Sequence, residues 1–402
     1  MIKRIIKKTF LYPILAQLYD YSNKNFNILK FSVQLFFAKF KTDIIFFFPF
    51  YSTGGAEKVH LNIVKVIKEK RPVVFFTGSS INEHFKSGFY DTARCYEIYF
   101  FIRDKGFARW LFKKTLICKL NRIQNLKIFG CNSQFYYELI PELSPKIRIV
   151  DLIHAFTDRH EPGAEKWSLS CAGKINTRVV INDKTKHDLI EQYRDSGLPE
   201  QLNNKIKLIY NKISIPASNH GKTYDEELNI LYVGRKSEEK RVNLVARIAC
   251  MCFENNINSK FYLIGGDLEK GVEKELHQYC NFTGAVMDEN ILMDYYQKSH
   301  ILLLTSSREG FPMVIMEALA NGVIPVSANV GGIPEHVKHG VTGLLIEHVS
   351  DEQELIIEAF EYIKRLNEDR DILMKMSKNA YFYAGNNFSE DQFNKKYKEL
   401  LA

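Results

Sequence analysis

The chain has 402 residues, 46% of them hydrophobic, and a single core is unusual at this length, so we expect two domains. The net charge of +8 is uneven, because residues 1–150 carry 25 Lys and Arg against 10 Asp and Glu, whereas residues 151–402 carry 30 against 37. The seven cysteines include no CxxC pair and no finger-like Cys/His spacing, which argues against a zinc module and favours reduced thiols in a cytoplasmic protein.

Residues 1–40 are predicted to form a basic helical segment. Lys7 and Lys8 interrupt its early apolar residues, which argues against a secretory signal. Its apolar and basic residues fall on adjacent helical faces, a pattern typical of helices that lie on anionic membranes. These residues are Ile2, Ile5, Ile6 and Phe10, beside Lys3, Arg4, Lys7 and Lys8. We therefore predict peripheral binding to the inner face of the cytoplasmic membrane, with packing of the segment on its own domain as the alternative.

Short apolar runs alternate with longer amphipathic stretches along the chain, which predicts an α/β fold with βαβ units and mainly parallel sheets. The longest apolar run, Ile44–Phe50, contains Pro49 and has the length of a strand, so no run reaches the roughly 18 to 20 apolar residues that span a bilayer. The predicted strands are 44–48, 73–77, 99–102, 126–129, 147–153, 178–181, 206–209, 229–233, 261–264, 301–304, 323–326 and 344–346.

A polar stretch separates the two groups of strands. Residues 215–227 contain Pro216 and Gly221 and show no apolar period, which is typical of a linker. The predicted organisation is a first domain 1–215, a linker 216–227, a second domain 228–385 and a C-terminal helical segment 386–402.

The segment from Ile301 to Ile346 carries the strongest chemical signal. After the strand, Pro312 suits the first turn of a helix, and residues 313–320 are apolar on every side except at Glu317. A helix that is apolar all round is normally buried, and a buried carboxylate needs a hydrogen-bonding partner. A vicinal diol would satisfy both oxygens of Glu317, and the alternative partner is a neighbouring backbone group.

The start of the same helix is suited to phosphate. The amides of Phe311, Met313 and Val314 cluster there directly after a strand, an arrangement that receives phosphate groups. A diphosphate beside a polyol describes a nucleotide-sugar, which is the ligand that we predict for this segment.

Three further positions are candidates for the site. Arg235 and Lys240 follow the first strand of the second domain and could hold a leaving diphosphate, although a solvated charged loop is the alternative. Gly54 and Gly55 lie at a strand-to-helix turn and permit close approach of a ligand, although a tight turn needs glycine anyway. His154 follows the strand 147–153, where a structural histidine is the alternative.

With these residues the chain resembles glycosyltransferase family 4. Glu309 and Glu317 are eight positions apart and match the E-x7-E pattern of that family. Residues 330–335 and 340–343 look like its GGxPE and DGxxG elements, with His339 where an Asp is common. The resemblance is close over residues 228–350 and looser over 44–60 and 147–212.

The resemblance implies a role for each candidate residue. Glu317 would bind the nucleotide ribose and Glu309 the donor sugar, while Arg241 stands where a glycine usually follows the lysine. The catalytic residues implied are His154, Arg235, Lys240 and Glu309. The donor-binding residues implied are Gly54, Gly55, Asn211, Arg235, Lys240, Val286, Glu309, Gly310, Phe311, Met313, Val314 and Glu317.

The resemblance also implies a fold and a reaction. The fold is GT-B, with two Rossmann-like parallel-sheet domains that face each other across a cleft and a last helix that crosses back to the first domain. The reaction is a retaining transfer from a nucleotide-sugar, with a UDP-sugar favoured over a GDP-sugar, to a hydroxyl of a glycan or lipid-linked acceptor. The products expected are cell-envelope polysaccharides such as lipopolysaccharide, O-antigen or capsule.

Neither a cofactor nor a metal is expected. The one DxD pattern, Asp369 to Asp371, is interpreted as solvated surface. The alternative functions are a nucleotide-sugar epimerase on the same fold and a non-catalytic nucleotide-sugar-binding scaffold. Nucleic-acid binding ranks last, because no recognisable module accompanies the basic half.

Overall fold

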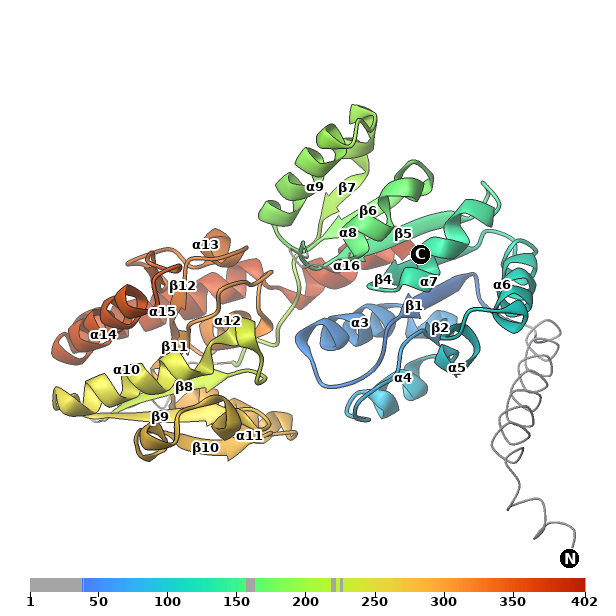
Figure 1. The fold of residues 1–402 in the computed structure, drawn as a ribbon. Helices are drawn as coiled ribbons and strands as arrows, with labels where there is room; N and C mark the ends of the chain where they lie inside the picture. The colour runs from blue at the N-terminus through green and yellow to red at the C-terminus, as the bar shows by residue number, and fades with distance from the viewer. Residues whose placement is uncertain (1–37, 39, 157–162, 218–221, 225–226, 402) are drawn as a thin grey trace, which may run out of the picture. The chain divides into compact units, whose positions relative to one another are not determined.

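The computed structural model describes residues 38, 40–156, 163–217, 222–224 and 227–401 (Figure 1). Most of the predicted basic segment 1–40 and parts of the predicted linker lie outside these residues. The chain divides into two compact units: unit 1 comprises Met1–Leu152, Thr157–Arg178 and Leu401–Ala402, and unit 2 comprises Ile153–Phe156 and Val179–Leu400. The predicted domain boundaries and the crossing of the last helix stay predictions.

A seven-stranded sheet contains every strand up to Leu208, in the order β3-β2-β1-β4-β5-β6-β7. Its central strands pair in parallel and are buried on both faces, which explains their continuous apolar runs. The strands are β1 (Ile44–Phe48), β2 (Val73–Phe76), β3 (Arg94–Glu97), β4 (Lys127–Cys131), β5 (Arg148–Ile153), β6 (Thr177–Val180) and β7 (Ile206–Leu208).

One predicted strand of this sheet is wrong. Residues 99–102 form a short helix, α5 (Tyr99–Ile102), and the strand is β3, five residues earlier. Among the described strands, β3 pairs with β2 alone and lies at the edge of the sheet, where charged side chains are tolerated. Its Arg94 and Glu97 therefore hid it from a search for apolar runs. The aromatic run that suggested a strand instead buries only Ile102.

The core of the seven-stranded sheet is aromatic and also contains one buried ion pair. The rings of Phe47 and Phe75, on neighbouring strands, have centroids 5.2 Å apart. Arg178 Nη2 lies 2.6 Å from Asp151 Oδ2, with the two side chains 1% and 0% exposed. The hydroxyl of Tyr137 donates to the same carboxylate at 3.2 Å. The ion pair therefore has the hydrogen-bond partners that a buried charge needs.

The helices between these strands belong to unit 1 up to Trp167 and to unit 2 from Asp183. They are α3 (Gly55–Val66), α4 (Lys86–Thr92), α5, α6 (Phe107–Leu120), α7 (Gln134–Leu139), α8 (Ala164–Trp167) and α9 (Asp183–Asp195).

A six-stranded parallel sheet forms the framework of the rest of unit 2, in the order β10-β9-β8-β11-β12-β13. Five of its strands were predicted; β10 was missed, because it is a short edge strand without a fully buried residue. The strands are β8 (Leu228–Val233), β9 (Ser259–Ile264), β10 (Asn281–Gly284), β11 (Ile301–Leu304), β12 (Ile324–Ala328) and β13 (Leu344–Ile346).

Helices connect the strands of this sheet, and α14, α15 and α16 follow its last strand. They are α10 (Val242–Glu254), α11 (Glu289–Lys298), α12 (Met313–Ala320), α13 (Ile333–His336), α14 (Glu352–Glu368), α15 (Arg370–Asn387) and α16 (Glu390–Leu401). The exposed Asp369 caps α15 by accepting the amide hydrogen of Ile372 at 2.9 Å, so its carboxylate has a structural use. No helix in the described part of the chain is long and apolar enough to cross a membrane.

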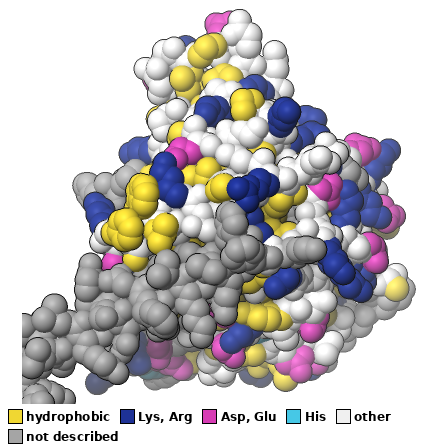
Figure 2. Space-filling view, turned by 90° about the vertical axis from the view of Figure 1, so that its right-hand side faces the viewer, with side chains coloured by type: hydrophobic (Ala, Val, Ile, Leu, Met, Phe, Trp, Pro, Cys, Tyr) yellow, Lys and Arg dark blue, Asp and Glu magenta, His cyan; other side chains and the backbone are white. Residues whose placement is uncertain are grey.

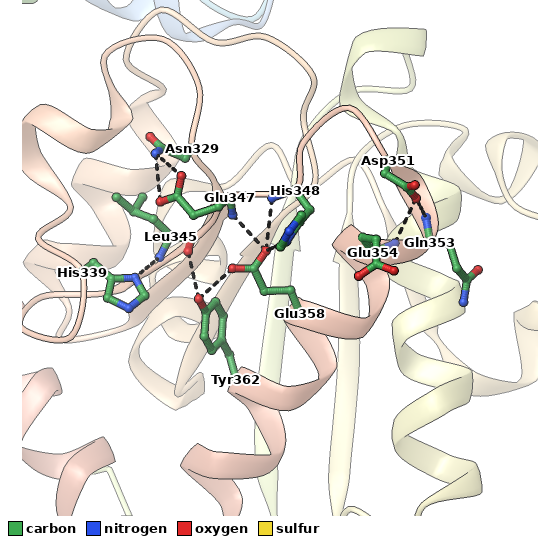
Figure 3. Close-up of polar contacts among 10 residues, drawn as sticks. All are labelled: Asn329, His339, Leu345, Glu347, His348, Asp351, Gln353, Glu354, Glu358 and Tyr362. Atoms are coloured by element: carbon green, nitrogen blue, oxygen red, sulfur yellow. Dashed lines mark hydrogen bonds and ion pairs between the residues drawn. The ribbon is translucent and has the colours of Figure 1, made fainter.

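A polar network fixes the connection from β13 to α14 (Figure 3). The carboxylate of Glu358 accepts hydrogen bonds from the amides of Glu347 (2.9 Å) and His348 (3.2 Å) and from the hydroxyl of Tyr362 (2.8 Å). Although burial raises the pKa of Glu358, these hydrogen bonds hold it below its usual value. The network fixes the backbone next to Val349, whose carbonyl contacts the candidate site.

Candidate active site

Two loops meet at the ends of the neighbouring strands β8 and β11. We call them the charged loop (Gly234–Arg241) and the glutamate loop (Thr305–Pro312). The Lys240 Nζ lies 2.5 Å from Glu309 Oε1, and their side chains are 17% and 9% exposed. The carboxyl ends of parallel strands are where α/β sheets bind ligands. The structure therefore brings together two residues that the sequence nominated from segments nearly 70 positions apart.

The two loops are joined by hydrogen bonds in both directions. Thr305 Oγ1 donates to the carbonyls of Lys240 (3.2 Å) and Arg241 (3.0 Å). Arg241 Nε donates to the carbonyl of Thr305 at 2.7 Å, and its Nη1 donates to that of Val349 at 2.8 Å. These bonds hold the backbone on either side of the Lys240 side chain.

Arg241 has a left-handed backbone conformation, which glycine adopts more readily than other residues. Its φ of 45° and ψ of 46° are left-handed, a region that costs a residue with a Cβ about 1 kcal/mol or more. The guanidinium hydrogen bonds offset this cost. Sequence reasoning noted the replacement but had no signal for the contacts, because Thr305 and Val349 are distant in the chain.

Glu317 lies in α12, at the position where the sequence placed it, and is 7% exposed. The hydroxyl of Tyr296, near the end of α11, donates to Glu317 Oε2 at 2.9 Å. Burial and the nearby carboxylate raise the pKa of Tyr296 well above its usual value, so the hydroxyl keeps its proton. Sequence reasoning missed this partner, since nothing in the pattern of α11 marks Tyr296 as facing a carboxylate.

The start of α12 has the geometry expected for anion binding. Pro312 is the N-cap, and the first amide of the turn to donate within the described residues is that of Ile315, to the Pro312 carbonyl at 3.0 Å. The amides of Phe311, Met313 and Val314 precede this bond, and their binding of phosphate stays a prediction. A helix start with such amides favours a negatively charged ligand.

Two glycines, Gly331 and Gly332, lie against the backbone of the glutamate loop. Gly331 has a φ of 59°, and a Cβ there would lie 1.7 Å from the carbonyl oxygen of Glu309. The amide of Gly332 donates to the carbonyl of Gly310 at 2.6 Å. The first two residues of the GGxPE element therefore allow a close backbone approach that fixes Glu309 and Gly310.

The last residue of this element, Glu335, caps a helix. Its carboxylate accepts the amide hydrogens of Asp183 (2.8 Å) and Lys184 (2.7 Å), the first two residues of α9. A carboxylate at a helix start is favourable, because the helix dipole is positive there. The sequence pointed to the motif but assigned no role to this glutamate.

His154 lies beside the glutamate loop. A Cβ added at Gly310 would lie 2.8 Å from the carbonyl oxygen of His154, so the two backbones are in close approach. Burial lowers the pKa of His154 to about 4, and the imidazole is neutral at pH 7. Asn211 is also buried, at 4% exposure, and its Oδ1 has no hydrogen-bond partner within the described residues.

The remaining predicted site residues are Arg235, Val286, Gly54 and Gly55. The Arg235 side chain is 74% exposed and pairs with Glu239 at 3.2 Å, in contrast to the enclosed Lys240. Val286 is half-buried in the connection after β10. Gly54 and Gly55 belong to unit 1, where Gly55 begins α3 and a Cβ on Gly54 would lie 2.0 Å from the carboxylate of Glu57. The crowding atoms belong to the flexible end of the Glu57 side chain and the φ of Gly54 is extended at 174°, so neither sterics nor backbone conformation requires glycine at this turn.

The comparison with known families now decides what kind of protein this is. Residues 217–382, which contain both loops and Glu317, match the family described as Glycosyl transferases group 1. These residues therefore form a domain of that family.

The curated relatives of the chain are distant. The D-inositol 3-phosphate glycosyltransferase of Streptosporangium roseum is 24% identical over 229 residues, which cover 52% of this chain and 52% of the relative. The UDP-Gal:alpha-D-GlcNAc-diphosphoundecaprenol alpha-1,3-galactosyltransferase of Escherichia coli is 25% identical over 251 residues, covering 52% and 63%. The chain spans about half the length of the first curated relatives that it matches.

Solved structures show the same fold over nearly the whole chain. HepE of Anabaena, in complex with UDP and glucose, superposes with a TM-score of 0.67 at 20% identity, covering 89% of this chain and 99% of HepE. The lipopolysaccharide outer core galactosyltransferase WaaB, in its apo form, gives 0.65 at 20% identity, with 89% and 98% covered. The two parallel sheets thus form a GT-B-like fold, as the sequence predicted.

Proposed function

We propose that this chain is a retaining glycosyltransferase that moves a sugar from a nucleotide-sugar to a hydroxyl of a glycan or lipid-linked acceptor. The observation that carries the proposal is the 2.5 Å pair of Lys240 and Glu309, enclosed at the ends of β8 and β11 and eight residues before the buried Glu317. Membership of a glycosyltransferase family supports the same reaction class.

The diphosphate would be held at the glutamate loop. One hydrogen of the Lys240 ammonium is given to Glu309, which leaves two for phosphate oxygens. The amides of Phe311, Met313 and Val314 would meet the same charge as it develops on the leaving group. Electrostatic stabilisation of this kind needs no reorganisation when the glycosidic bond breaks. Arg235, whose side chain is exposed, would bind the diphosphate from the solvent side of the charged loop.

The two glutamates would bind different parts of the donor. Glu317, oriented by the Tyr296 hydroxyl, would accept hydrogen bonds from the ribose diol. Glu309, next to Gly310 and the neutral His154, would contact the sugar. The acceptor hydroxyl would then attack the anomeric carbon from the face that the diphosphate leaves. The departing phosphate would take the acceptor proton, so the anomeric configuration is retained.

The donor and pathway are proposed from relatives. HepE is solved with UDP-glucose, and the Escherichia coli relative is a UDP-Gal transferase acting on a diphosphoundecaprenol acceptor, which favour a UDP-sugar here. WaaB is a lipopolysaccharide enzyme, and another relative comes from a capsule region of Klebsiella pneumoniae. We therefore assign this chain to cell-envelope polysaccharide synthesis at the inner face of the cytoplasmic membrane.

A panel of nucleotide-sugars tests this proposal. Incubation of the purified protein with UDP- and GDP-sugars should raise the melting temperature for one base, since a ligand that binds only the folded state stabilises it. The stabilising donor should then lose its sugar to an added acceptor glycan. Conversion of the donor to its epimer without an acceptor would favour the epimerase, and binding without any turnover would favour the scaffold.

A further inference from the structure

Exposed aromatic rings lie on two neighbouring helices of unit 1, α5 and α6, whereas Lys240, Glu309 and Glu317 belong to unit 2. Phe107 and Trp110 of α6 are 72% and 52% exposed, and their ring centroids are 5.6 Å apart. Phe100 of α5 is 64% exposed, with the guanidinium of Arg103 4.7 Å from its ring centroid. Three large rings are therefore in contact with water rather than with the protein core.

The exposure of these rings follows from how α6 is seated. Phe112, on the buried face of α6, stacks on Phe101 of α5 at 5.7 Å and ties the two helices together. The outward residues recur at spacings of three and four, so they form one stripe along the helix. This stripe consists of Phe107, Trp110, Lys114 and Cys118. Phe107 and Trp110 form the aromatic end of this stripe, on a helix whose opposite face is buried.

The same surface carries positive charge. Residues 99–122 contain seven Lys and Arg against a single acid, Asp104. Two glutamates that follow in the chain neutralise part of this charge, because Glu138 pairs with Arg109 at 2.6 Å and Glu142 serves both Lys113 (3.2 Å) and Lys114. Counted with these two glutamates, residues 99–122 keep a net charge of +4, but one of these cations, Lys119, is buried and is not part of the surface. Figure 2 shows hydrophobic side chains beside Lys and Arg on this side of the molecule.

We propose that the α5–α6 surface, defined by Phe100, Arg103, Lys105, Phe107, Trp110 and Lys114, docks on an anionic lipid bilayer. Exposed aromatic rings are suited to the headgroup region, where the ring body is dehydrated and the indole N–H stays hydrated. The surrounding cations are attracted to lipid phosphates. A second copy of the chain would bring the same positive charge, so electrostatics oppose self-association through this surface.

This docking goes beyond the proposed function, because it requires neither donor nor acceptor. It gives unit 1 a membrane contact in addition to the predicted segment 1–40, whose described residues Ala38 and Phe40 contact Lys119 of α6. If the chain transfers sugar to a lipid-linked acceptor, the contact would bring that acceptor close to the enzyme. Binding can be measured in the full chain without any turnover, so failure of one proposal is distinguishable from failure of the other.

The tryptophan content of the chain allows a direct test. Trp110 and Trp167 are the two tryptophans, so the Trp167→Phe variant makes Trp110 the sole fluorophore. We expect its emission to shift to the blue with phosphatidylglycerol vesicles at low salt and to be quenched by brominated acyl chains. Pure phosphatidylcholine vesicles should give neither effect. A vesicle-bound protein whose Trp110 emission is unchanged would overturn the proposal.

Flotation of the full chain with variants separates this surface from other sources of binding. Phe107→Ala should weaken vesicle binding about tenfold, and Lys105→Gln about fivefold. Phe253→Ala, at a ring that is 67% exposed on α10, and Lys378→Gln, at an exposed lysine of α15, are matched controls and should bind normally. Equal losses in the controls, no loss at Phe107 and Lys105, or no flotation of the parent chain would each contradict docking through α5 and α6.

Discussion

Two pairs of opposite charge differ in how completely they are enclosed. Asp151 and Arg178 join adjacent strands inside the seven-stranded sheet and are 0% and 1% exposed. Lys240 and Glu309 join two loops at the ends of β8 and β11 and are 9% to 17% exposed. Both pairs have short contacts, at 2.6 Å and 2.5 Å, so distance alone does not distinguish them.

The difference lies in the hydrogen-bonding capacity that each pair keeps. The Asp151 carboxylate is occupied by two nitrogens of Arg178 and by the Tyr137 hydroxyl, all within the sheet. The Lys240 ammonium retains hydrogens at a strand end, beside a helix start with amides available for an anion. A charged pair that is fully satisfied in the core contributes to structure, whereas one that keeps donors at the end of a sheet is available for a ligand.

The largest expected effect is on transfer and comes from Lys240. Lys240→Ala should lower the rate of transfer about a hundred- to a thousandfold, because one fixed donor to a developing negative charge is lost. Lys236→Ala, at an exposed lysine of the same loop, is the matched control and should keep nearly full activity. Release of nucleoside diphosphate in the presence of acceptor measures both. Equal activity of the two variants would remove Lys240 from the mechanism.

The next effect is on stability and comes from the other pair. Asp151→Asn should lower the free energy of unfolding by about 3 to 5 kcal/mol, since it leaves the buried Arg178 charge uncompensated. Urea denaturation measures this loss. The double variant Asp151→Leu with Arg178→Met should recover most of it, because an apolar pair leaves no buried charge. An Asp151→Asn protein as stable as the parent would show that the pair is not structural.

A smaller effect is expected at Arg241, which we interpret as a positioning residue for Lys240. Arg241→Gly keeps the left-handed backbone available and removes the bonds to Thr305 and Val349, so kcat should fall about tenfold with KM for the donor little changed. Added guanidinium at millimolar concentration should restore part of kcat. Arg241→Ala should be less stable than Arg241→Gly, because alanine pays the cost of the left-handed conformation. Unchanged kcat in Arg241→Gly would contradict this interpretation.

The smallest effect is expected from chelation. With the diphosphate held by Lys240, Arg235 and the amides at the start of α12, transfer should continue largely unchanged in EDTA. The assay is the rate of transfer before and after chelation, with added magnesium or manganese as the control. Complete loss in EDTA that either metal restores would contradict these roles.

The sequence predicted best where the chain is apolar and continuous. The strand 301–304 and the helix 313–320 match β11 and α12 to the residue, because a buried strand and a buried helix are marked by hydrophobic runs, interrupted here only at Glu317. The edge strands β3 and β10 were placed wrongly or missed, since exposed edges tolerate polar residues and leave no such run. The other two edge strands, β7 and β13, were predicted within one residue, so an edge position hides a strand only where its run of residues is polar.

The candidate site was predictable in its residues and not in its contacts. Lys240, Glu309 and Glu317 carry motif signals, and the structure encloses all three. Tyr296 and Thr305 carry none, because the bonds that they make depend on which helix and strand ends come together in the fold. Contacts of this type are set by tertiary packing, which spacing along the chain does not report.

The central claim, that the enclosed glutamates bind a nucleotide-sugar in different ways, is tested most directly by calorimetric titration with UDP. Glu317→Ala should weaken UDP binding roughly ten- to a hundredfold, since it removes one partner of a buried, charge-assisted hydrogen bond. Glu309→Ala should bind UDP almost as the parent does and yet lose transfer in a parallel turnover assay. If Glu309→Ala loses UDP as badly as Glu317→Ala, or if both variants transfer sugar normally, the assignment of the site is wrong.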